Sequence, residues 1–150
     1  MKKIILLITL IFPLLNGKVL LPQEDGIVEF LAVKENLREY YKLNNNSYLV
    51  SGPSFITIYA RLAVPKNEKG PYRFSMNYSL SEVSKLEPIH KFEKRIDSSV
   101  SSAFHPMHRY TKSAKIEIKI PKGDYVLSIN NESDVRKPIL MRVVQKRRKI

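Results

Sequence analysis

The chain has 150 residues, and 43% of them are hydrophobic, which suits one globular domain and excludes a polytopic membrane protein or a disordered polyelectrolyte. It has no cysteine, so a disulfide framework, a thiolate metal site and a cysteine nucleophile are excluded. The formal net charge of +12 favours an anionic partner, such as nucleic acid, acidic lipid or an acidic polymer.

The N-terminal segment has the organisation of a secretory signal. The basic pair Lys2-Lys3 precedes a nearly unbroken apolar run at residues 4–15, which a small polar exit follows. This run is shorter than the stretch of about 20 residues that a membrane-spanning helix needs. We therefore expect residues 1–17 to be a cleaved signal peptide, with no transmembrane segment after cleavage and a mature protein in the periplasm or at the cell surface. Losing Lys2 and Lys3 lowers the net charge from +12 to about +10, and export makes nucleic acid an unexpected partner.

The mature chain is expected to consist of β-strands. Short apolar segments separated by turn residues predict strands, in chain order, at residues 27–33, 39–43, 48–50, 55–64, 72–80, 114–120, 125–129 and 139–144. The alternation of apolar and polar side chains is clearest at residues 72–80 and 114–120. Residues 55–64 are apolar on both faces, which predicts a central strand buried on both sides.

The segments between the strands carry turn signals. Residues 51–53 and 69–71 each combine glycine with proline and are expected to interrupt the strands, and residues 121–124 predict a tight hairpin. Residues 81–86 have apolar spacing that also fits one helical turn, and residues 97–112 are expected to form a long irregular loop.

These elements predict an all-β fold, an antiparallel β-sandwich or jelly roll of about eight strands. The expected organisation is a signal peptide at residues 1–17, one domain at residues 18–145 and a basic tail at residues 146–150.

One loop contains residues that are suited to metal binding. His105, Met107 and His108 offer imidazole nitrogen and thioether sulfur within four residues, and these soft ligands suit copper. His90 is a candidate for a third nitrogen. A periplasmic copper-handling protein is therefore an alternative function, although loop histidines more commonly face water.

Catalysis has little support in the sequence. Ser98, Ser99, Ser101 and Ser102 lie between Asp97 and His105, but a catalytic triad is defined by geometry and not by proximity in sequence. No nucleophile elbow, zinc-protease helix or glycine-rich phosphate loop is present, and the acidic residues lie beside lysines and arginines. We expect a protein that is not an enzyme and needs no cofactor.

The basic residues offer the better functional signal. Lys115 and Lys119 project from one face of their predicted strand. The other candidates lie near the C-terminus: Arg136, Lys137, Arg142, Lys146, Arg147, Arg148 and Lys149. If the last strand lies near residues 114–120, these side chains merge into one positive surface. The expected function is an exported binding or assembly module of the cell envelope, with an envelope protein or an anionic polymer such as a glycan as its partner.

Overall fold

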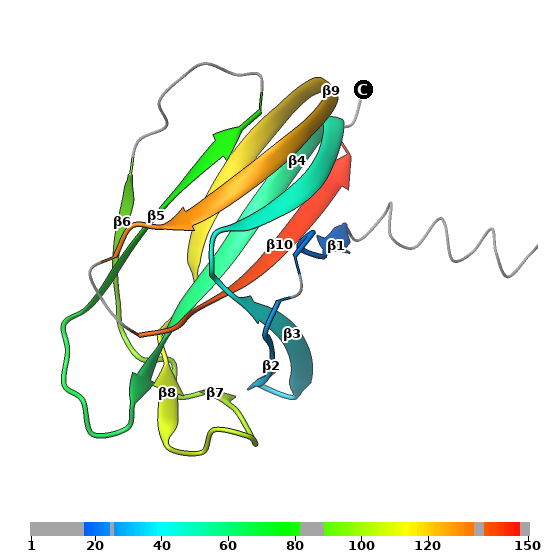
Figure 1. Ribbon diagram of the computed structural model, residues 1–150. Coiled ribbons are helices and arrows are strands. Elements are labelled where there is room, and N and C mark those ends of the chain that lie inside the picture. The colour runs from blue at the N-terminus through cyan, green and yellow to red at the C-terminus, as the bar shows by residue number, and fades with distance from the viewer. Residues whose placement is uncertain (1–16, 25, 82–88, 134–136, 148–150) are drawn as a thin grey trace, which may run out of the picture.

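The computed structural model describes residues 17–24, 26–81, 89–133 and 137–147 (Figure 1). In these ranges the regular elements are all β-strands, so the all-β prediction is confirmed. The strands are β1 (Lys18–Leu20), β2 (Val28–Val33), β3 (Asn36–Lys42), β4 (Asn46–Pro65), β5 (Tyr72–Leu80), β6 (His90–Lys94), β7 (Val100–Ser101), β8 (His108–Tyr110), β9 (Ala114–Asn131) and β10 (Ile139–Arg147). No helix in the described ranges is long and apolar enough to span a membrane. Apart from Gly17 and Ser81, the expected signal peptide at residues 1–17 and the expected helical turn at residues 81–86 lie outside those ranges.

All strands belong to one antiparallel arrangement. The order is β6-β5-β9-β4-β10-β3-β2-β7, with β1 paired to β10 and β8 paired to β4. Figure 1 shows that this sheet curls into a half-barrel. A single curled sheet does not by itself establish the two packed sheets of a sandwich or jelly roll.

The two longest strands bend together, and here two expectations were wrong. Residues 121–124 do not form a hairpin, and residues 51–53 do not end a strand, because β4 and β9 continue through both segments. Gly52 lies opposite Gly123, and the register shifts between Gly52 and Ser54. A Cβ on Gly52 would lie 1.8 Å from the carbonyl oxygen of Pro121, and Gly123 has a φ of +126°. Glycine at both positions lets the paired strands approach closely and bend as a unit.

The concave side of the sheet holds the main core. Along β4, alternate residues from Tyr48 to Leu62 point into it, and β5 contributes Phe74 and Met76. The alternation predicted at residues 72–80 and 114–120 is confirmed, because one face of each segment packs on this core.

A second, smaller core lies on the opposite side of β4 and β10. Its buried members are Leu31, Tyr40, Ala63, Val100, Tyr110 and Leu140. It covers only one end of β4: residues 60–64 are all buried, whereas Phe55 is 45% exposed. The prediction that residues 55–64 are buried on both sides therefore holds only for the second half of that segment.

Candidate functional site

Part of the convex side, formed by β9, β4 and β10 with β4 in the middle, is mostly exposed to solvent, although Val144 of β10 is buried. We call it the outer face. Its residues form three rows across the strands: Lys115–Tyr59–Arg142, Glu117–Thr57–Val144 and Lys119–Phe55–Lys146. Neighbouring strands are about 4.8 Å apart, so β9 and β10 are separated by about 10 Å. Lys115 and Lys119 of β9 therefore lie on the same side of the sheet as Arg142 and Lys146 of β10, with β4 between the two pairs.

The first and third rows have the same composition. Each places an aromatic side chain of β4 between a cation of β9 and a cation of β10. Tyr59 is half-buried and Phe55 is exposed, as are Lys115, Lys119 and Lys146. Four residues along a strand correspond to about 13 Å, so the two aromatic positions are that far apart.

The charge of the outer face is positive. It carries four cations and, among the residues that define it, one carboxylate, Glu117. Lys115 Nζ lies 3.0 Å from Glu117 Oε1, and both side chains are more than half exposed. The hydrogen bond to Glu117 and the charge of that carboxylate raise the pKa of Lys115, so this lysine stays protonated at neutral pH. An exposed pair of this kind contributes little to stability, and an anionic ligand can exchange with it.

Other predicted basic residues do not join the outer face. Lys137 Nζ forms an ion pair with Glu68 Oε2 at 2.8 Å, before the start of β10. Arg147 is exposed at the end of β10, opposite the buried Ser54 of the core side. Arg136, Arg148 and Lys149 lie outside the described residues.

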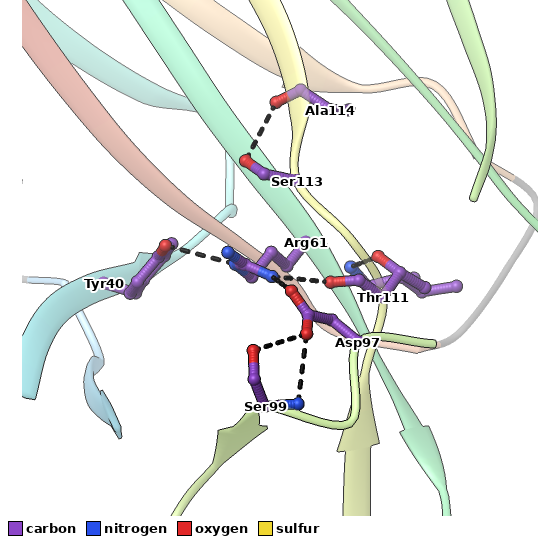
Figure 2. Close-up of polar contacts among 8 residues, drawn as sticks. Tyr40, Arg61, Asp97, Ser99, Thr111, Ser113 and Ala114 are labelled. Atoms are coloured by element: carbon purple, nitrogen blue, oxygen red, sulfur yellow. Dashed lines mark hydrogen bonds and ion pairs between the residues drawn. The ribbon is translucent and has the colours of Figure 1, made fainter. Parts of the chain in front are cut away.

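A buried arginine marks the end of the outer face. Beyond Tyr59, the next side chain on this side of β4 is Arg61, which is only 7% exposed. Its Nε donates to Tyr40 Oη at 3.2 Å, and its Nη1 donates to the carbonyl oxygen of Thr111 at 3.0 Å and to Asp97 Oδ2 at 3.3 Å. Figure 2 shows the guanidinium pointing between these partners. The arginine thus ties β4 to β3 and to the segment around residues 97–111.

The carboxylate in this network is held ionised. The Ser99 hydroxyl donates to Asp97 Oδ1 at 2.6 Å and the Ser99 backbone N–H at 3.1 Å, as Figure 2 also shows. These bonds, together with Arg61, lower the pKa of Asp97 despite its partial burial. These contacts are internal to the protein and join β4 to β3 and to the segment around residues 97–111, so they hold the second core against the sheet.

The candidate metal loop brings its two histidines together. The imidazole rings of His105 and His108 lie 5.5 Å apart between centroids, while the Met107 side chain is 69% exposed. His105 Nε2 lies 3.1 Å from Oε1 of Glu29, a residue that the sequence did not indicate. Among the side chains described by the structure, no group of three or more His, Cys, Asp or Glu residues is arranged to hold a metal ion. Copper binding by this loop remains a prediction. His90 lies on β6, where its ring stacks between Tyr78 and Phe92.

The aromatic residues of the outer face, Phe55 and Tyr59, were not predicted from the sequence. Phe55 and Tyr59 belong to an apolar run that reads as a strand buried on both sides. Their local sequence gives little to separate them from core residues, because their exposure depends on where β2, β3 and β7 cover the sheet. A pattern of two aromatic residues four apart on one strand face was the only available signal.

Comparisons with known proteins do not place the chain in a family. No family model matches it, and no curated protein matches it. Among solved structures, it is similar to part of a family 115 4-O-methyl-α-glucuronidase with specificity for decorated arabinogalactans, at 14% identity and a TM-score of 0.43. It is also similar to part of an exo-β-1,3-galactanase from Phanerochaete chrysosporium, at 8% identity and a TM-score of 0.40. The matches cover 84% and 87% of this chain but only 16% and 29% of those chains. Similarity this low carries no argument about activity.

Proposed function

We propose that this chain is an exported, non-enzymatic module of the cell envelope that binds an anionic polymer through its outer face. The observation that carries the proposal is that Lys115, Lys119, Arg142 and Lys146 share one solvent-facing surface around β4. In this proposal the curled sheet is a sandwich, and the main core lies between the halves of β4 and β9 on either side of their bend. We also propose that residues 1–17 are a cleaved signal peptide, so that the mature module lies in the periplasm or at the cell surface.

The charge distribution supports a polymer more than a single small anion. The four cations lie at the corners of a surface about 10 Å by 13 Å, so no single small anion contacts them all. A chain with repeated negative groups can engage several at once, and each additional contact makes dissociation slower. The excess of positive charge over the whole protein also accelerates the encounter. An envelope protein with an acidic surface remains the other partner class.

The first test is retention of the purified protein on isolated envelope material at low salt and at about 0.5 M salt, where the Debye length falls to a few ångströms. The variant Lys115→Gln, Lys119→Gln, Arg142→Gln, Lys146→Gln should lose most of the salt-sensitive retention. Its matched control changes four exposed lysines elsewhere and so carries the same net charge: Lys66→Gln, Lys69→Gln, Lys91→Gln and Lys112→Gln.

The control variant should retain most of the binding. Equal losses in both variants would mean that net charge matters and the outer face does not. Retention that resists salt and survives the outer-face changes would indicate a specific protein partner instead.

A second candidate function is copper handling by the loop that contains His105 and His108. The observation in its favour is that these two rings lie side by side, with Met107 between them in the sequence. Titration of the protein with Cu(I) should then show submicromolar affinity (on the order of 10⁻⁷ M) that disappears when both histidines are changed to alanine. Unchanged binding in that variant, or none in the original protein, rejects this function.

A further inference from the structure

Three segments meet at one end of the molecule, away from the outer face. We call this region the loop end: residues 34–37 at the turn between β2 and β3, residues 66–69 after β4, and residues 102–107 between β7 and β8. The backbone N–H of Lys34 donates to the carbonyl oxygen of Ser99, just before β7, at 3.1 Å, and that of Lys66 donates to the carbonyl oxygen of Met107 at 2.9 Å. Figure 1 shows the β2–β3 turn and the β7–β8 loop at the same end of the molecule.

Large apolar side chains gather on this end. Phe30 of β2, Leu37 of β3 and Phe104 of the β7–β8 loop line one cleft of about 430 Å³. They expose 40%, 70% and 77% of their surfaces, and Met107 on the same loop exposes 69%. Single exposed apolar side chains are common on folded proteins, whereas a group contributed by separate segments marks an interaction surface.

The charge beside these side chains is positive. The exposed charged residues at the end of the hairpin balance one another, two of each sign: Lys34, Glu35, Arg38 and Glu39. Lys66 and Lys69 are exposed beside Met107, and no ion pair in the described part of the chain engages them. Other nearby carboxylates already face basic side chains: Glu68 faces Lys137, Glu29 faces His105 and Asp97 faces Arg61. The loop end therefore combines exposed apolar side chains with an excess of cations.

From this combination we infer that the loop end docks on a membrane surface that contains anionic lipid, with Leu37, Phe104 and Met107 among the lipid headgroups. Such a surface places apolar chains directly beneath negative charge, so it matches both components of the loop end. A soluble polyanion would leave the apolar side chains in water. The long stems of Lys66 and Lys69 keep their ammonium groups at the level of the headgroups while the apolar side chains lie deeper.

The loop end and the outer face are separate surfaces. Tyr59 of the outer face and Pro65 at the end of β4 are six residues apart, which corresponds to about 20 Å along the strand, and the buried Arg61 lies between them. A protein docked through the loop end leaves the outer face in solvent, where it can bind a polymer. The membrane inference goes beyond the proposed function and does not depend on it.

The experiment places a fluorescent reporter at the loop end. The chain has no tryptophan, so Phe104→Trp reports on this position alone, and Leu49→Trp is the matched control at another exposed apolar position, 64% exposed on β4. A local reporter is needed because the apolar run at residues 4–15 can itself bind lipid while it is attached. The full chain is titrated with phosphatidylcholine vesicles, with and without phosphatidylglycerol, and quenching by brominated lipid is measured.

The tryptophan of Phe104→Trp should shift its emission to shorter wavelength and be quenched on vesicles with phosphatidylglycerol, and much less on phosphatidylcholine alone. The tryptophan of Leu49→Trp should show neither effect. No shift at residue 104, or the same shift at residue 49, overturns the inference. A shift at residue 104 that follows protein concentration without any vesicle also overturns it, because a second copy of the chain then covers the loop end.

Two pairs of substitutions in the Phe104→Trp protein test the charge. Lys66→Gln with Lys69→Gln should raise the vesicle concentration at half-maximal shift by about tenfold or more, whereas Lys115→Gln with Lys119→Gln, of equal net charge on the outer face, should raise it by less than about threefold. Equal effects of the two pairs overturn the inference. Leu37→Ser with Met107→Ser should weaken binding by about tenfold, and unchanged binding is likewise contrary to it. Circular dichroism establishes that each variant is folded.

The outcome is independent of the test of the outer face. Vesicles contain lipid alone, whereas retention on envelope material is judged by changes to the outer face, with Lys66→Gln and Lys69→Gln among its controls. If the loop end fails to dock while the outer-face variant loses retention, only the membrane inference is lost. If the loop end docks while the outer-face variant is retained normally, only the proposed function is lost.

Discussion

The bend shared by β4 and β9 should depend on the absence of a side chain at residue 52. In Gly52→Ala, the new methyl group would lie 1.8 Å from the carbonyl oxygen of Pro121 and 2.6 Å from that of Ile120. Ordinary non-bonded contacts begin at about 3.5 Å, so the closer oxygen would have to move by about 1.7 Å. Because both oxygens belong to the backbone, no rotamer change relieves the clash.

Separating the strands at this point costs free energy on both sides of the bend. Residues 46–52 pair with residues 123–129, and residues 54–60 pair with residues 114–120, so the clash lies between two halves of one ladder. We expect a loss in the free energy of unfolding of about 3 kcal/mol, the upper part of the range for overpacked sites. That is a large fraction of the roughly 5–15 kcal/mol that stabilises a typical domain.

Urea unfolding followed by far-UV circular dichroism measures the effect. With a urea dependence of about 2 kcal/mol per molar, a loss of about 3 kcal/mol lowers the midpoint by about 1.5 M. The control is Gly70→Ala, whose methyl group would first meet the movable side-chain ring of Tyr72, at 3.1 Å, and which should change stability by less than about 0.5 kcal/mol. A midpoint for Gly52→Ala within about 0.3 M of the original protein would refute the steric reasoning.

Further predictions concern the buried network at the end of the outer face. Arg61→Leu should lower the free energy of unfolding by about 3 kcal/mol, because it leaves buried acceptors without a donor. The control is Arg73→Leu, at an ion pair whose arginine side chain is 71% exposed, and it should lower the free energy of unfolding by less than about 0.5 kcal/mol. Equal losses in urea unfolding would contradict this. Thr111→Val should cost about 1–3 kcal/mol, because the Thr111 hydroxyl accepts the backbone N–H of Leu62 at 3.0 Å in the core; an unchanged midpoint would reject that role. Asp97 has a lowered pKa when folded, chiefly through its bond from the Ser99 hydroxyl, so its stabilising effect is present above its unfolded pKa of about 3.9 and is lost as the pH falls through the folded value. Asp97→Asn should therefore be less stable at neutral pH and lose less of its remaining stability between about pH 5 and about pH 2 than the original protein; parallel pH profiles would contradict this.

The sequence by itself determined the all-β class and the side chains that share a strand face. Alternation with a period of two is a local property, so Lys115 and Lys119 were assigned to the same side of one strand without knowledge of its neighbours. The same reasoning correctly assigned the apolar face of residues 72–80 to the core. It also located the glycines at which the backbone departs from a regular strand, although it interpreted them as the end of a strand and a hairpin.

Only the tertiary structure decided which strands are neighbours. Pairing between β4 and both β9 and β10 joins residues far apart in the chain, and the free energy that selects it comes from burial of the whole core, which no local pattern encodes. That pairing placed Arg142 across β4 from Lys115, while an ion pair with Glu68 held Lys137 away. It also left Phe55 exposed, because the second core covers β4 only beyond Arg61. The fold class follows from local chemistry, whereas the candidate site follows from long-range packing.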